Sequence, residues 1–367
     1  MAELVDATDL KSVGLFVLAG SSPAAGTIIN FFISTLSNIS NYQDIQAIKK
    51  FVKHDIAFVE KHLQDFIAGS SSELSKDVAA NILNSGGKRI RPIITILSGK
   101  LFGFQEAALY QLATAVELIH TATLLHDDVI DNSEMRRGNK TANNLYGNKA
   151  PILVGDYLFS GSFMHMVNTG SLDALQILAK ASSVIAEGEV RQLELQNKKS
   201  FIYQDYLNVI TAKTAILFAA AAESAAVLAN RSSSQARIMH EFGLNLGIAF
   251  QIIDDVLDYS ADAKKIGKNL GDDFYEQKIT LPIILLYEQS DSNGKTDIAR
   301  IFNKDDPQKN DLNFILSELN SKNIFARCLD QARSHIDQAL HSLSAFPENE
   351  YRQVLEAICY VTISRES

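Results

Sequence analysis

The sequence predicts an all-α protein built as one large helical bundle. No proline occurs between Pro151 and Pro282, and proline is the residue that most strongly breaks helices. The same stretch is rich in Ala, Leu, Ile, Glu and Gln, and its apolar residues recur at spacings of three and four, as in Leu244, Ile248 and Ile252. Neither an alternating run with hairpin residues nor a strand–glycine–helix unit interrupts this pattern.

Composition limits the function classes. The chain has 367 residues, of which 46% are hydrophobic and 21% charged, so it can bury a large core and is not disordered as a whole. Acidic residues number 43 and basic residues 34, which argues against a nucleic-acid binder, because such proteins carry basic faces. Cys328 and Cys359 form no disulfide framework and suit a reducing cytoplasm, where we expect the protein to act. The lack of a Cys/His cluster in the sequence excludes a structural zinc site.

The N-terminal segment differs from the rest of the chain. Residues 13–36 are apolar at both ends, but a Gly-Ser-Ser-Pro run at 20–23 interrupts them before they reach the roughly 20 residues that span a bilayer. Acidic residues precede this stretch, whereas a signal peptide begins with basic ones. We therefore predict a poorly ordered extension over 1–40, outside the fold and without an integral membrane segment. A misplaced start codon is an alternative origin of this extension.

Short breaks divide the helical domain, which we expect over 41–367. The sequences SGG at 85–87, GNKA at 147–150 and ANRSSS at 229–234 are typical of turns between helices. The polar stretch 289–311 predicts a surface loop with at most a short helix inside it. None of these breaks resembles a flexible interdomain linker, so we expect a single domain.

Two acidic clusters indicate the chemistry. Each has carboxylates at positions i, i+1 and i+4 within an apolar sequence, so the first and third share one helix face. The six residues are Asp127, Asp128 and Asp131 in the first cluster, and Asp254, Asp255 and Asp258 in the second. Carboxylates this close repel one another unless cations neutralise them, and oxygen ligands without Cys or His suit Mg²⁺. One such cluster alone is as often a solvated helix surface, but the repeated spacing favours two helices that face each other around a polyphosphorylated ligand.

Basic residues near these clusters could bind phosphate. The sequence GGKRIRP at 86–92 places Lys88, Arg89 and Arg91 after two glycines, where the backbone can approach a ligand closely. It is not a Walker loop, because the Ser or Thr after the lysine is missing. Further candidates are Arg136, Arg137, Lys213 with Thr214, and Lys268. Singly, each is more often a solvated surface charge.

In combination these motifs resemble the trans-isoprenyl diphosphate synthases, and more closely the bacterial long-chain, octaprenyl-type members. The resemblance runs from about residue 45 to the C-terminus. It rests on the motifs at 86–92, 117–138, 153–160, 188–193, 213–215, 250–259 and 267–273. One departure is visible at 277–282, where QKITLP stands in place of the Gly-Lys-x-Thr-Leu-Pro common in relatives, with the lysine kept. The resemblance implies an isoprenoid-synthase bundle with a central cavity, and a homodimer.

The resemblance also implies roles for individual residues. Mg²⁺ would be held by Asp127, Asp131 and Asp254, with Asp128, Asp255 and Asp258 acting directly or through water. The allylic diphosphate would be bound by Arg136, Lys213 and Lys268, and isopentenyl diphosphate by Lys88, Arg91, His120 and Arg137. Thr214 and Gln251 are further substrate-binding candidates. His120 lies seven residues before Asp127, two helical turns, and therefore faces the same way.

Product length is expected to depend on the residues before the first cluster. Thr123 and Ala122 lie four and five residues before Asp127, roughly 6–7.5 Å along the helix. Short-chain relatives usually have an aromatic residue at one of these positions, which closes the cavity. Two small residues predict a cavity that continues past this depth and hence a long-chain product, although tight helix packing also favours small residues. The resemblance implies an octaprenyl product for a respiratory quinone, with seven, nine or ten units open.

Three other functions remain as alternatives. A farnesyl or geranylgeranyl diphosphate synthase would share the motifs but is disfavoured by Ala122 and Thr123. A terpene cyclase would carry a different second motif and would not need GGKRIRP. A catalytically silent partner subunit typically lacks one aspartate cluster, and this chain has both.

Overall fold

Helices make up nearly all regular structure in the computed structural model, which describes residues 42, 44–260 and 270–364. The helices before the first acidic cluster ends are α2 (Ile45–Phe51), α3 (Lys53–Ala68), α4 (Glu73–Asn84), α5 (Ile90–Leu101) and α6 (Ala107–Ile130). A short antiparallel hairpin follows, formed by β1 (Met135–Arg136) and β2 (Asn139–Lys140). The prediction of an all-α fold is therefore confirmed.

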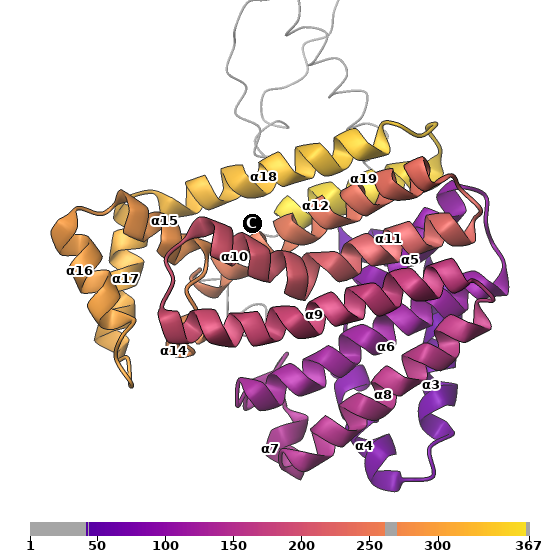
Figure 1. The fold of residues 1–367 in the computed structure, drawn as a ribbon, viewed down its shortest axis with the longest axis horizontal. Coiled ribbons are helices and arrows are strands. Elements are labelled where there is room, and N and C mark those ends of the chain that lie inside the picture. Colours follow the sequence, from indigo (N-terminus) through magenta and orange to yellow (C-terminus); the bar gives the residue numbers. More distant parts are fainter. Residues whose placement is uncertain (1–41, 43, 261–269, 365–367) are drawn as a thin grey trace, which may run out of the picture. The chain divides into compact units, whose positions relative to one another are not determined.

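The remaining helices complete the bundle (Figure 1). They are α7 (Ala142–Tyr146), α8 (Lys149–Asn168), α9 (Leu172–Lys198), α10 (Tyr203–Ile210), the π-helix η2 (Thr211–Ala215), α11 (Ile216–Leu228), α12 (Ser233–Asp258), α14 (Asp272–Tyr275), α15 (Leu281–Gln289), α16 (Ser292–Ile301), α17 (Lys309–Ser321), α18 (Ile324–Leu343) and α19 (Glu350–Ile363). The described residues belong to one compact unit. The predicted extension over 1–40 lies outside the described residues, as does Lys268.

Helix α11 lies at the centre of the bundle, between α9 and α12 in Figure 1. It also contacts α5 and α6. Its sequence contains the run Ala219–Ala222, which is buried throughout. Alanine combines a high helix propensity with a small side chain, so neighbouring helices can approach α11 on all sides. This packing explains why every residue of the helix except Glu223 and Ser224 is apolar.

One helix in the described part of the chain is long and apolar enough to cross a membrane. It is the continuous segment Tyr203–Leu228, which joins α10, η2 and α11, and 67% of its apolar window is buried inside the protein. The neighbours of α11 account for this apolarity, since a core helix has the same composition as a membrane span.

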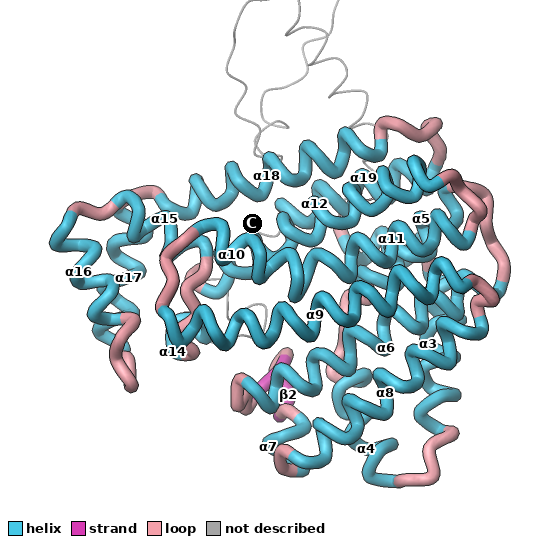
Figure 2. Tube along the Cα trace, in the orientation of Figure 1, coloured by secondary structure: helices cyan, strands magenta, loops and turns pink. Residues whose placement is uncertain are grey.

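The helix boundaries agree with the breaks expected from the sequence. Helix α4 ends before the Ser-Gly-Gly turn, and α12 begins at Ser233 after a capping box formed by Ser232 and Gln235. The polar stretch 289–311 is more regular than expected, because it contains the ten-residue helix α16, which Asp291 caps. Loops gather at the ends of the helices (Figure 2), and the two acidic clusters lie at the C-terminal ends of α6 and α12.

Candidate active site

The first acidic cluster lies at the C-terminal end of α6. Asp127 and Asp128 are in its last turn, and Asp131 is the C-cap residue. The C-terminus of a helix carries partial negative charge, so acidic residues are unfavourable there without cations. Each carboxylate has its own cation. Asp127 lies 3.6 Å from Lys213, and Asp131 lies 2.8 Å from Lys278.

Asp128 is the buried member of this cluster, with 2% of its surface exposed. Its Oδ1 accepts a hydrogen bond from Nε of Arg136 at 2.8 Å and lies 2.7 Å from Nη2 of the same guanidinium. Burial raises the pKa of Asp128, and the Arg136 guanidinium acts in the opposite direction. Because Arg136 lies on β1, this pair fixes the hairpin against the end of α6. Asp127 and Asp131 are only half-buried and are more open to a ligand.

Lys213 reaches the first cluster from the π-helix η2. Its Nζ lies 2.9 Å from Glu189 on α9, in addition to its contact with Asp127. Two glycines bring the neighbouring helices close to η2. A methyl group on Gly188 would lie 2.7 Å from the Cβ of Ala212, and one on Gly247 would lie 2.6 Å from the Cα of Ala215. π-Helical segments often occur at functional sites, and here the segment aims a lysine at an aspartate.

The second cluster lies at the C-terminal end of α12. Asp255 and Asp258 are buried, whereas Asp254 is half-buried. The Oδ2 of Asp258 accepts a hydrogen bond from the backbone N–H of Asp273, and its carbonyl oxygen accepts one from Gly271. Asp258 therefore holds the start of α14 in place. Asp254 is the member of this cluster most open to a ligand.

Asp255 is held by two donors. The hydroxyl of Tyr206 donates to Oδ2 and the side-chain amide of Gln251 donates to Oδ1, both at 2.7 Å. Gln251 in turn accepts a hydrogen bond from the Thr214 hydroxyl at 2.8 Å. Burial, together with the nearby charge of Asp273, raises the pKa of Asp255, and the two donated hydrogen bonds oppose that shift.

A separate group of basic residues surrounds His120. Nη1 of Arg91 lies 3.2 Å from Nε2 of His120, and the guanidinium stacks over the ring of Phe218 at 4.4 Å. Burial and the charges of Arg91 and Arg137 lower the pKa of His120 well below its usual range. The neutral imidazole can therefore accept a hydrogen bond from Arg91. Lys88 and Arg137 are exposed beside this group, where they could meet a ligand from solvent.

Arg89 shapes the loop that carries Lys88 and Arg91. Its side chain is bound by Glu60 and Glu117, each at 2.7 Å. Its backbone is left-handed, with φ of 52° at the N-cap of α5. Such a conformation costs energy outside glycine and needs support from its surroundings. Arg89 is therefore an anchor of the loop, which the sequence alone grouped with the phosphate-binding candidates.

Known proteins are similar to this chain in both sequence and fold. A family model described as polyprenyl synthetase matches residues 72–319. The octaprenyl diphosphate synthase of Escherichia coli is 36% identical over 326 residues, which cover 88% of this chain and 99% of that protein. The chain belongs to the polyprenyl synthetase family.

Two further proteins of this family are similar to the chain over most of its length. The all-trans-nonaprenyl-diphosphate synthase of Rhodobacter capsulatus is 35% identical and matches over 86% of this chain and 96% of its own. The crystal structure of a polyprenyl synthase from Caulobacter crescentus, complexed with calcium and isoprenyl diphosphate, superimposes with a TM-score of 0.85 at 38% identity. It covers 89% of this chain and 99% of its own. This polyprenyl synthetase is therefore a prenyltransferase of isoprenoid biosynthesis that acts on isoprenoid diphosphates, and its family generally uses a divalent metal.

The donor set of this polyprenyl synthetase fits such a metal. Among the described residues, no three His, Cys, Asp or Glu side chains form a group that could hold an ion by themselves. Mg²⁺ is usually held by one or two carboxylates together with substrate phosphates and water, rather than by a protein cage. Asp127, Asp131 and Asp254 are carboxylates of this kind, and all three are half-buried rather than enclosed.

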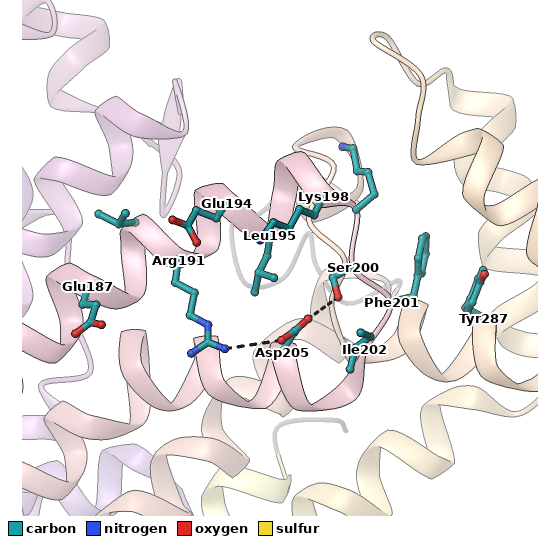
Figure 3. Close-up of a pocket in the computed structure, with 12 residues that line it drawn as sticks. Glu187, Arg191, Glu194, Leu195, Lys198, Ser200, Phe201, Ile202, Asp205 and Tyr287 are labelled. Atoms are coloured by element: carbon teal, nitrogen blue, oxygen red, sulfur yellow. Dashed lines mark hydrogen bonds and ion pairs between the residues drawn. The ribbon is translucent and has the colours of Figure 1, made fainter.

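The cavities of the synthetase differ in their chemistry. A groove of about 950 Å³ runs along the C-terminal half of α9 and the loop that follows it (Figure 3). None of the predicted site residues lines it. A smaller pocket of about 140 Å³ is lined by Lys213, Thr214, Gln251 and Asp255, together with Lys278. Charged and hydrogen-bonding groups therefore converge at the smaller pocket.

Sequence reasoning missed three residues of this region. Lys278 was noted only as a retained lysine, yet it binds Asp131. Glu189 lies within GEVRQL at 188–193, which helped to identify the family. Tyr206 belongs to no motif. Nothing in a single sequence pairs these residues with partners that lie 24 to 147 positions away.

Proposed function

We propose that the chain is a Mg²⁺-dependent long-chain all-trans-polyprenyl diphosphate synthase. It extends farnesyl diphosphate or a similar allylic primer with isopentenyl diphosphate, and its product is octaprenyl diphosphate for the side chain of a respiratory quinone. The observation that carries the length assignment is the pair of small residues Ala122 and Thr123 on α6. The octaprenyl diphosphate synthases of E. coli and Haemophilus influenzae, each 36% identical to this chain, support it.

The two substrates are assigned to different sides of the site. Asp127, Asp131 and Asp254 would hold Mg²⁺, which stabilises the charge on the departing diphosphate when it is bound. Asp128, Asp255 and Asp258 complete the clusters by fixing neighbouring groups. Lys213 and Arg136 would bind the allylic diphosphate, with Lys268 as a third candidate. Isopentenyl diphosphate would bind to Lys88, Arg91, His120 and Arg137. Thr214 and Gln251, which line the small pocket, are further substrate-binding candidates.

The reaction has three steps. The allylic C1–O bond breaks, and its electron pair leaves with the diphosphate, which Lys213 and Arg136 stabilise electrostatically. The double bond of isopentenyl diphosphate then attacks C1, which forms the new carbon–carbon bond. Loss of a proton to the released diphosphate gives the new double bond. The apolar wall of α6 keeps water away from the cation, which water would otherwise convert to an alcohol.

A single incubation tests the proposed function. Purified protein, Mg²⁺, farnesyl diphosphate and radiolabelled isopentenyl diphosphate are combined, and the dephosphorylated products are separated by chain length. We expect a product well beyond geranylgeranyl, with octaprenyl as the main species. A farnesyl or geranylgeranyl product would keep the reaction but contradict the length assignment. No product from folded protein would favour a silent partner subunit.

We also propose a homodimer, with α8 and α9 at its interface. Large apolar side chains are exposed along both helices, including Met164 and Val167 on α8 and Leu172 on α9, which is 82% exposed. Helices α8 and α9 contact each other, and exposed large apolar side chains on neighbouring elements are typical of an interface. Together with the buried free thiols of Cys328 and Cys359, it fits an assembled cytoplasmic enzyme.

A charge introduced on this face should dissociate the dimer. Met164→Glu would place an unpaired carboxylate in a desolvated interface, which is strongly unfavourable. We expect analytical ultracentrifugation to give a dimer for the wild type and a monomer for the variant. Leu74→Glu, at an exposed apolar position on α4, is the control and should stay dimeric. Dissociation of both variants, or of neither, would place the interface elsewhere.

A further inference from the structure

Tyr206 is buried beside the site but has no role in the reaction described above. It lies on α10, and only 6% of its surface is exposed. Its hydroxyl begins a chain of hydrogen bonds that continues through Asp255 and Gln251 to Thr214. The chain joins three elements, since Tyr206 is on α10, Asp255 and Gln251 are on α12, and Thr214 is on η2. All four side chains line the small pocket.

The last hydrogen bond of this series, from Thr214 to Gln251, affects the neighbouring residue Lys213. Thr214 and Lys213 are neighbours in η2, and their side chains contact different helices. Thr214 donates to Gln251 on α12, whereas Lys213 contacts Glu189 on α9 and Asp127 on α6. A π-helix has wider turns than its α-helical flanks, so its side-chain directions depend on where the extra residue sits. The bond from Thr214 to Gln251 therefore helps to set the direction of Lys213.

Each link depends on the one before it. The side-chain amide of Gln251 has a donor nitrogen and an acceptor oxygen. Because the nitrogen donates to Asp255, the oxygen is oriented to accept from Thr214. Asp255 in turn is held by Tyr206 through its other oxygen. Without the tyrosine hydroxyl, a buried carboxylate oxygen would lose its partner, which is costly enough to make Asp255 rotate or recruit water.

We propose that Tyr206 is a positioning residue for prenyl transfer, which acts through Asp255, Gln251 and Thr214 to orient Lys213 toward the allylic diphosphate. The first turn of α10 is also fixed, because Asp205 accepts a hydrogen bond from Ser200 and lies 3.8 Å from Arg191 (Figure 3). The inference rests on the assignment of Lys213 to the allylic substrate under the proposed function.

Tyr206→Phe tests this role, because it removes only the hydroxyl. We expect kcat/KM for farnesyl diphosphate to fall about tenfold, the usual effect of losing a hydrogen bond to a charged group. The KM for isopentenyl diphosphate should change by less than about twofold, since Arg91 and His120 lie in a separate hydrogen-bonded group. The matched control is Tyr203→Phe. Tyr203 is half-buried on the same helix, and its hydroxyl makes no hydrogen bond within the described residues.

A double variant separates positioning from general damage. If Tyr206 acts through Thr214, then Tyr206→Phe combined with Thr214→Val should be no slower than the slower single variant. The proposal would be overturned if the two single-variant losses in kcat/KM multiplied in the double variant, or if Tyr206→Phe left kcat/KM for farnesyl diphosphate unchanged. It would also be overturned if Tyr206→Phe raised the KM values for both substrates equally. A Tyr203→Phe enzyme as slow as Tyr206→Phe would overturn it too. Thermal unfolding of each variant should shift by less than about 4 °C. An inactive wild type would instead refute the proposed function, and a wild type with a different product length would leave the Tyr206 test intact.

Discussion

Asp127→Asn is expected to lower turnover by about a hundredfold to a thousandfold, the usual cost of removing one group that stabilises transition-state charge. Asp127 is half-buried beside Lys213 and is assigned to the metal that neutralises the departing diphosphate. Asparagine keeps the shape of the side chain but not its charge, so Mg²⁺ binding should weaken. Steady-state rates at increasing Mg²⁺ concentrations measure both effects, and Asp254→Asn should behave in the same way.

The fold should survive this change. Lys213 keeps its ion pair with Glu189 at 2.9 Å, so no cation is left without a partner, and circular dichroism should report unchanged helicity. Asp330→Asn on α18 is the matched control, because Asp330 is an exposed aspartate outside both clusters and outside the motifs of the family. It should keep the wild-type rate. An Asp127→Asn enzyme with near-normal turnover would contradict the metal assignment.

Ala122→Tyr is expected to shorten the product to farnesyl or geranylgeranyl length. The proposed path of the growing chain runs along α6, and a tyrosine roughly 7.5 Å from the metal ligands would block it. Chain-length analysis of the products measures this change directly. Ala122 is 1% exposed and belongs to a buried apolar cluster with residues of α3, α4 and α8. The larger side chain should therefore also cost about 1–3 kcal/mol of unfolding free energy.

A substitution at a second buried alanine distinguishes a blocked product path from overpacking of the core. Ala142 on α7 is 2% exposed and belongs to the same cluster, so Ala142→Tyr introduces the same bulk from another helix. We expect similar destabilisation in urea unfolding but an unchanged product length. Thr123→Tyr, at a half-buried position, should shorten the product with less loss of stability. Full-length product from both α6 variants would mean that the growing isoprenoid chain follows another path through the protein.

The helical architecture could be predicted from sequence because its determinants are local. Helix propensity, apolar spacing and turn residues act over a few positions, so the breaks at 85–87 and 229–234 coincide with the ends of α4 and α11. Helix α16 within 289–311 was the main underestimate. Its apolar residues are few, and its stability depends on packing by Ile298 and Ile301, which local pattern does not reveal.

The residue types of the site were also readable from sequence. Carboxylates at i, i+1 and i+4, together with GGKRIRP, indicate metal and diphosphate chemistry whatever the surrounding fold. Their individual states were not readable. Asp128 and Asp131 are three positions apart, yet one is buried against Arg136 and the other is half-buried beside Lys278. Arg89 and Arg91 are neighbours, but Arg89 anchors the loop through two glutamates while Arg91 lies beside His120.

The sequence by itself determined that this protein is an all-α enzyme with two aspartate clusters and a basic loop, because helix formation and metal-ligand chemistry follow from residue type and short spacing. The tertiary structure alone decided which charges meet. Lys278 reaches Asp131 across 147 positions, and Tyr206 reaches Asp255 across 49. Such pairs form because distant helices pack side by side, and burial makes each polar group find a partner. The chemical type of each site residue could thus be predicted from its local sequence, whereas the partner and orientation of its side chain depended on how the helices pack.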